Sequence, residues 1–186
     1  MNGAKKIHKK EGTKMVYTFD KKDSGIIGKA FEMAIKDALN RKNPNSVSPC
    51  GVSDFRYFRR NYDAKQNGSC VRYSENGSYI KGSNRVLYAT HVSHTVTAET
   101  EETISIEIDL LGTEIFVLDR QEFIGFLLEN GMVKINASRG TANIQTCYNY
   151  KKDAYHGRTG KRIEEWAREN ELDDDIVSVI YDKVEG

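Results

Sequence analysis

The chain has 186 residues, of which 38% are hydrophobic and 30% are charged, and its formal net charge is +1 at pH 7. Its ten tyrosines, seven phenylalanines and one tryptophan supply enough buried surface to exclude a chain that is disordered throughout. The balanced charge argues against a protein that merely coats nucleic acid, although basic residues cluster locally.

The three cysteines, Cys50, Cys70 and Cys147, are widely spaced and form no Cys-x-x-Cys pair. We therefore expect neither a disulfide framework nor a zinc site. No apolar run approaches the roughly 20 residues that a membrane helix needs, and no apolar core follows the basic N-terminus as it would in a signal peptide. The sequence thus predicts a cytoplasmic protein without a membrane segment.

Residues 1–15 are rich in lysine, and we expect them to form a basic flexible arm. A short strand is predicted from Met15 to Phe19. Residues 16–186 fit one mixed α/β domain, which ends in a helical extension from about residue 161.

The first helix is predicted from Ser24 to Arg41, because apolar residues recur there in pairs every four residues. Ser24 is the expected N-cap residue. Glu32 lies next to the apolar stripe of this helix and not on its opposite, fully exposed side.

Strands and turns are expected from Val52 to about Phe116. Asn67-Gly68 and Asn76-Gly77 are the strongest hairpin signals in the sequence. A longer strand is predicted over Arg85–Val92, extending toward Thr97. Thr103–Leu110 alternates apolar and polar residues, which indicates a strand with one buried face and one wet, acidic face.

A second helix is predicted to begin at Asp119, which serves as its N-cap, and to stop at Gly131. Short strands and two final helices, over 162–170 and 173–184, complete the expected order of elements. That order predicts an α/β (or α+β) protein with a central mixed β-sheet flanked by helices.

The segment from Asp54 to Lys65 carries the residues best suited to chemistry. If residues 62–66 form a strand, Asp63 and Lys65 project from the same face, since successive side chains alternate. Asp54 precedes Asp63 by nine residues, which leaves room only for short strands and a tight turn. Two carboxylates held together repel each other, and a divalent cation with oxygen ligands relieves that repulsion.

This arrangement resembles the active-site motif of the PD-(D/E)xK nuclease superfamily, which includes many restriction enzymes, resolvases and repair nucleases. Asp54, Asp63 and Lys65 match the strand positions of that motif, Glu32 looks like its helix acid, and Gln66 follows the lysine as it often does in the family. The order of elements also agrees over about 24–130. The chain is further similar to uncharacterised proteins of bacterial mobile elements.

The resemblance implies a restriction-endonuclease-like fold and an endonuclease that cuts DNA with Mg²⁺ or Mn²⁺. Asp54, Asp63 and Glu32 would hold the metal, a metal-activated water would attack a backbone phosphate, and Lys65 and Gln66 would complete the catalytic group. DNA is the first expected partner and RNA the second. Two alternatives stay open: a catalytically inactive nucleic-acid-binding module of the same fold, and a protein-interaction domain.

Basic residues supply the expected phosphate contacts. Arg56, Arg59 and Arg60 lie in the segment 55–60, whose sequence Phe-Arg-Tyr-Phe-Arg-Arg is unusual for a hairpin in a core. A second group lies in a loop that interleaves basic and aromatic residues: Lys151, Lys152, Arg158 and Lys161. Such segments hold phosphates and stack exposed bases, and the alternative for the loop is a solvated connection.

The same acidic residues also fit a purely structural role. Ser53 stands where the nuclease family has proline, so Asp54 could instead cap a helical turn, and Asp63 could pair with Arg59 or Arg60. We expect His91 and His94 on opposite faces of a strand, where they would not share a metal ion.

Overall fold

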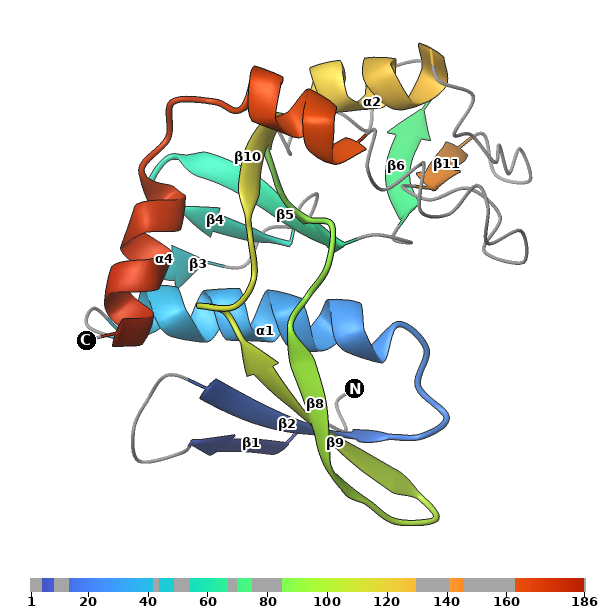
Figure 1. Ribbon diagram of the computed structural model, residues 1–186, viewed down its shortest axis with the longest axis vertical. Coiled ribbons are helices and arrows are strands. Elements are labelled where there is room, and N and C mark those ends of the chain that lie inside the picture. The colour runs from blue at the N-terminus through green and yellow to red at the C-terminus, as the bar shows by residue number, and fades with distance from the viewer. Residues whose placement is uncertain are drawn as a thin grey trace. The chain divides into compact units, whose positions relative to one another are not determined.

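The structure is a computed structural model that describes residues 5–8, 14–41, 44–48, 54–66, 70–74, 85–129, 141–145 and 163–185. Within these ranges the protein is an α+β fold with helices and three β-sheets, so the predicted class is confirmed, although the described strands do not form one central sheet (Figure 1).

The chain divides into two compact units, each assembled from segments that are distant in the sequence. The first unit comprises Met1–Ser46, His91–Glu114 and Asp175–Gly186. The second unit comprises Val47–Thr90 and Ile115–Asp174. Because the chain passes back and forth between the units, no single stretch of sequence marks a boundary.

The first unit contains a four-stranded antiparallel sheet in the order β1-β2-β9-β8. Its strands are β1 Lys5–His8, β2 Lys14–Asp20, β8 His94–Glu99 and β9 Thr103–Asp109. Residues 5–8 belong to the segment expected to be an arm, yet they pair with β2. The strand expected over Arg85–Val92 ends at Ala89, and the chain leaves that sheet before it enters β8.

Helix α1, Ile26–Asn40, has a stripe of small and large apolar residues that is fully buried. This stripe confirms the predicted periodicity. The predicted N-cap is wrong, because Gly25 and not Ser24 occupies that position, with φ of 64° and no side-chain hydrogen bond. Glycine adopts this left-handed conformation at little steric cost. None of the described helices is long and apolar enough to cross a membrane.

Helix α1 contacts β2, β9 and helix α4, Ile176–Glu185. The hydroxyl of the fully buried Tyr17 donates a 2.6 Å hydrogen bond to Asp37 on α1. Burial, and then this bond to a carboxylate, raise the pKa of Tyr17 well above its usual range. This bond joins the sheet to the helix inside the core of the first unit.

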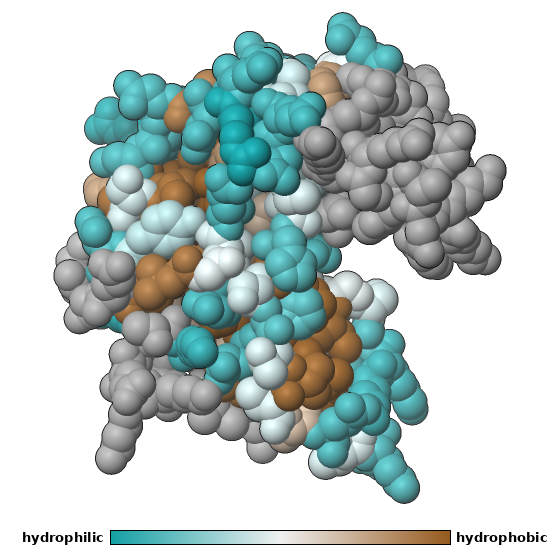
Figure 2. Space-filling view, in the orientation of Figure 1, coloured by the Kyte–Doolittle hydropathy of each residue, from teal (hydrophilic) through white to brown (hydrophobic). Residues whose placement is uncertain are grey.

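Strands β8 and β9 form a hairpin, and every residue of β8 is exposed. Hydrophilic side chains cover the tip of this hairpin (Figure 2). On β9, Ile106 and Ile108 are buried as the alternation predicts. Glu107 is an exception to the predicted wet face, because it is buried and lies 4.0 Å from the ammonium group of Lys14 on the paired strand.

The second unit contains a five-stranded mixed sheet in the order β10-β7-β5-β4-β3. Strands β5 and β7 pair in parallel, and the other pairs are antiparallel. The strands of this sheet are β3 Val47–Ser48, β4 Phe55–Tyr57, β5 Arg60–Gln66, β7 Arg85–Ala89 and β10 Phe116–Asp119.

A separate two-stranded sheet in this unit pairs β6, Cys70–Ser74, with β11, Thr141–Gln145. The hairpin predicted at Asn67-Gly68 is therefore wrong, since the strands before and after this dipeptide belong to different sheets. The second hairpin signal, Asn76-Gly77, lies outside the described residues.

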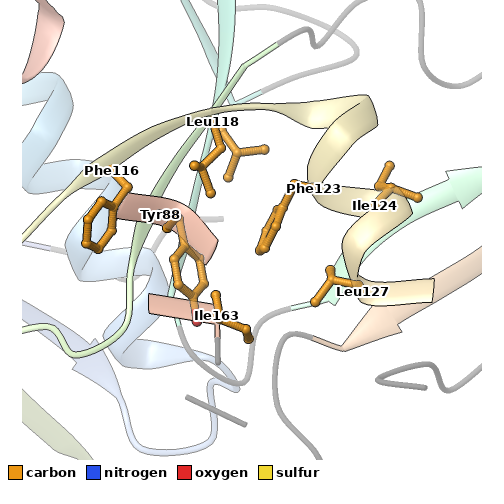
Figure 3. Close-up of a cluster of buried hydrophobic side chains, with 9 residues drawn as sticks. Tyr88, Phe116, Leu118, Phe123, Ile124, Leu127 and Ile163 are labelled. Carbon is orange, nitrogen blue, oxygen red and sulfur yellow. The ribbon is translucent and has the colours of Figure 1, made fainter. Parts of the chain in front are cut away.

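Helix α2, Arg120–Glu129, and a helix over residues 163–170 cover one face of the five-stranded sheet. Their apolar side chains meet Val86, Tyr88, Phe116 and Leu118 in a hydrophobic cluster (Figure 3). The predicted N-cap of α2 is confirmed, because the Glu122 amide donates a 3.0 Å hydrogen bond to the Asp119 carboxylate.

Candidate functional site

Strands β4 and β5 form a hairpin, and their register pairs Phe55 with Tyr62 and Tyr57 with Arg60. The connection is a two-residue turn, Phe58-Arg59, so the prediction of short strands and a tight turn is confirmed. The rings of Phe55 and Tyr62 stack with centroids 5.5 Å apart. This hairpin carries Asp54 and Asp63 at its base.

The carboxylates of Asp54 and Asp63 each accept a hydrogen bond from a backbone amide of the opposite strand end. The Asp54 amide donates a 3.1 Å hydrogen bond to Oδ1 of Asp63, and the Ala64 amide donates a 2.8 Å hydrogen bond to Oδ2 of Asp54. The two carboxylates thus close the base of the hairpin where the ladder between β4 and β5 ends. The approach predicted between Asp54 and Asp63 is present.

Asp63 also forms a buried ion pair with Arg120, the first residue of α2. Its Oδ2 lies 3.4 Å from Nε of Arg120, and the two residues are only 7% and 3% exposed. A guanidinium at the start of a helix meets the positive end of the helix dipole, and the Asp63 carboxylate offsets that unfavourable charge. The structural role suggested for Asp63 is therefore present, but the arginine is Arg120 and not Arg59 or Arg60.

Lys65 lies on the same face of β5 as Asp63. In the parallel pairing, Asp63 is opposite Val86 and Lys65 is opposite Tyr88, and both of these partners belong to the cluster beneath α2. Lys65 is half-buried, and its ammonium group forms no ion pair with any described residue. Gln66 is also half-buried and ends the strand.

Glu32 belongs to the first unit, on α1. Its carboxylate lies 2.7 Å from the ammonium group of Lys36, one helical turn later, and both side chains are partly exposed. This is an ordinary i,i+4 pair on a helix surface. The participation of Glu32 in a metal site stays a prediction.

The three arginines of segment 55–60 are exposed. Arg60 lies 3.6 Å from the buried carboxylate of Asp174 and is still 49% exposed. Within the described part of the chain, Arg56 and Arg59 form no ion pair with a carboxylate. The residues predicted to bind phosphate from the basic loop, Lys151, Lys152, Arg158 and Lys161, lie outside the described residues.

Asp174 is a buried acid that the sequence pattern did not single out. It accepts hydrogen bonds from the Tyr62 hydroxyl at 2.8 Å and from Arg85 at 2.6 Å. Burial, and then the bond to Asp174, raise the pKa of Tyr62 above its usual range. Asp174 thus fixes the hairpin strand β5 to the end of β7 from a loop more than 80 residues away in the chain.

His91 and His94 lie closer together than strand geometry suggested. Their ring centroids are 6.2 Å apart, because His91 lies in a bend before β8 and not on the strand itself. Nδ1 of His94 is 2.6 Å from the carbonyl oxygen of Val92. The expectation that the two rings point to opposite faces is therefore wrong.

The donor set at the base of the hairpin does not fit a magnesium centre as it is arranged here. Among the described residues, Asp54 and Asp63 are the acids placed there, each carboxylate already accepts a backbone amide, and the guanidinium of Arg120 lies beside Asp63. Across the described ranges, no group of three or more His, Cys, Asp or Glu side chains is placed to hold a metal ion. Compared with protein-family models, with curated proteins and with solved structures, the chain gives no match.

Proposed function

We propose that the protein binds nucleic acid through the tip of the β4–β5 hairpin, and that Asp54 and Asp63 serve to hold this hairpin in place. The observation that carries the proposal is the pair of exposed arginines, Arg56 and Arg59, that have no carboxylate partner among the described residues. Guanidinium groups displayed in this way suit the planar, bidentate recognition of phosphate.

The hairpin is built to present these arginines rigidly. Its base is closed by the hydrogen bonds between Asp54, Asp63 and Ala64, and its buried side is fixed by the stacked rings of Phe55 and Tyr62. A rigid display lowers the entropy that is lost when a ligand binds. The chain's near-neutral net charge means that local, not overall, charge must attract the polyanion.

The salt dependence of binding tests this proposal. Affinity for a labelled oligonucleotide is measured at several salt concentrations for the wild type and for the double variant Arg56→Gln, Arg59→Gln. Loss of two phosphate contacts should reduce the slope of log K against log salt by roughly 1.4–1.8. The control is Lys22→Gln, Lys29→Gln, which removes the same charge from exposed residues of the first unit. An unchanged slope in the arginine variant would refute the proposal.

A wild-type protein without affinity for nucleic acid at about 0.1 M salt would instead favour the protein-interaction alternative, because weak surface attraction is screened there. Binding that is unaffected by EDTA is expected, since the arginines need no metal. Single-stranded and duplex DNA, and RNA of the same sequence, are compared in the same assay.

Metal-dependent DNA cleavage is the second candidate, and the contact between Asp54 and Asp63 favours it. On this proposal the five-stranded mixed sheet with α2 corresponds to a restriction-endonuclease-like core, and Asp54, Asp63, Lys65 and Gln66 are its catalytic group. Because Arg120 forms an ion pair with Asp63 in this arrangement, metal binding and cleavage would require the guanidinium to move away from the carboxylate.

Lys65 gives the sharpest test of cleavage, since substitutions of Asp63 also break a buried ion pair. Lys65→Gln removes the ammonium group without removing any ion pair between described residues, so folding should be preserved. Supercoiled plasmid is incubated with the protein and Mg²⁺ or Mn²⁺. Cutting by the wild type that Lys65→Gln abolishes supports the nuclease, whereas equal cutting by both points to a contaminant.

A further inference from the structure

Phe58, at the tip of the β4–β5 hairpin, is the most exposed large hydrophobic residue of the described chain. Its side chain is 79% exposed, compared with 48% for Val96 and 40% for Leu111. The ring contributes little to the core, because most of its surface stays in water. The exposed ring is therefore available for contact with a ligand at the tip of the hairpin.

The backbone of Phe58 makes its presence more unusual. Its φ is 55°, in the left-handed region, and Asn45 is the only other described non-glycine residue with a positive φ. Two-residue hairpin turns normally place glycine, asparagine or aspartate at such a position, and a bulky residue there is strained. Phe58 therefore combines a strained backbone conformation with an exposed side chain.

The surroundings of Phe58 indicate the kind of partner. The ring of the buried Tyr57 meets it edge-on, with centroids 4.6 Å apart and planes at 77°, which orients the ring while most of its surface stays open. Arg56 lies two residues before it, Arg59 directly follows it, and Arg60 follows the turn. An aromatic face among guanidinium groups complements a ligand that combines flat, apolar rings with negative charge.

We propose that Phe58 is a stacking platform for an unpaired base, so that the hairpin binds single-stranded nucleic acid in preference to an intact duplex. This inference rests on the proposed function. Bases of a single strand have open faces that stack on aromatic side chains regardless of sequence. Bases inside a duplex are already stacked on one another, so contact with Phe58 would require costly unstacking.

The test compares the wild type with Phe58→Gly and Phe58→Tyr in binding to labelled single-stranded DNA, single-stranded RNA and duplex DNA. Glycine suits the positive φ, so Phe58→Gly relieves strain and should fold at least as well as the wild type. We expect it to weaken single-strand binding by roughly five- to 150-fold, the range for loss of one stacked base. Phe58→Tyr keeps the ring and should bind like the wild type.

Because Phe58→Gly removes no charge, its salt dependence and its duplex affinity should match those of the wild type. Equal weakening of duplex and single-strand binding would overturn the preference for unpaired bases, and wild-type affinity in Phe58→Gly would overturn the stacking role. In either case the salt-dependent binding through Arg56 and Arg59 would stand. If the wild type binds no nucleic acid, both proposals fail, and Phe58 is left as a contact for a protein partner.

Discussion

The ion pair between Asp63 and Arg120 makes a quantitative prediction about stability. Asp63→Asn keeps an Oδ1 acceptor for the Asp54 amide but removes the negative charge that faces Arg120. Removal of one partner of a buried ion pair typically costs 3–5 kcal/mol, because the other charge stays buried. The distance of 3.4 Å from Nε of Arg120 to Oδ2 of Asp63 is long for such a pair, so we expect a loss of about 3 kcal/mol in the free energy of unfolding.

Urea titration followed by tryptophan fluorescence measures this loss. The only tryptophan, Trp166, stacks on Phe123 and Phe126 in the second unit and so reports on the unit that contains the ion pair. The matched control is Glu164→Gln, which breaks a partly exposed pair with Arg168 in the same unit and should cost about 0.3–0.5 kcal/mol.

A double-mutant cycle with Arg120→Met isolates the interaction itself. The double variant should be less destabilised than the sum of the two single variants, by roughly 0.5–3 kcal/mol, since it removes both charges of the pair together. Asp63→Asn that unfolds within about 0.5 kcal/mol of the wild type would refute the structural role of Asp63.

Three further predictions concern single residues. Phe58→Gly should raise the free energy of unfolding by about 0.5–1 kcal/mol in the same urea titration, because it relieves a strained positive φ; a lower value would mean that the contact with Tyr57 outweighs the strain. Gly25→Ala should lower the thermal midpoint through a loss of about 1 kcal/mol, because alanine disfavours the φ of 64° before α1; an unchanged midpoint would contradict this. Above about pH 10 the unfolded chain releases tyrosine protons that folded Tyr17 and Tyr62 retain, so the free energy of unfolding should fall by up to about 1.4 kcal/mol per pH unit for each tyrosine. Urea titrations at several pH values measure this fall, and Tyr17→Phe should remove the part of it that Tyr17 causes; an unchanged pH dependence in that variant would contradict the reasoning.

Local periodicity was sufficient to predict the elements that bury a continuous face. Helix α1 and strand β9 follow their patterns of apolar residues closely, since one amphipathic face is enough to determine where such an element packs. The cap of α2 at Asp119 was also readable, because a capping carboxylate and its amide partner are neighbours in sequence.

The sequence pattern did not predict which strands pair with one another. Asn67-Gly68 has the composition of a tight hairpin, but β5 pairs with β7, and β6 pairs with β11 about 70 residues later. A turn signal reports only the local backbone preference, whereas pairing depends on which distant strands complete the sheet. Each of the two compact units is likewise assembled from segments that are distant in the sequence.

At the candidate site, too, local geometry was predicted from the sequence, whereas a contact between distant residues was not. The spacing of Asp63 and Lys65 correctly placed both on one face of β5, and the nine-residue interval to Asp54 gave the tight hairpin. The sequence could not show that Arg120, 57 residues later, would reach Asp63, since any of the chain's cations was an equal candidate. Phe58 could have been noticed, because a phenylalanine directly before two arginines at a predicted tight turn is already unusual.

The chemistry of Asp63 depends on which positive charge stands beside it, and Arg120→Met separates the two possibilities. Without the guanidinium, the Asp63 carboxylate next to the Asp54 backbone loses the positive charge beside it, and a divalent cation with oxygen ligands would supply one. If Arg120 is the structural partner of Asp63, millimolar Mg²⁺ should raise the thermal midpoint of Arg120→Met and leave that of the wild type unchanged, because only a ligand that binds the folded state stabilises it. Asp63→Asn combined with Arg120→Met should lose the response to Mg²⁺, which assigns it to this carboxylate. An equal rise in the wild type would show that Mg²⁺ binds whether or not Arg120 is present, which would contradict the idea that Arg120 takes the place of a metal ion beside Asp63.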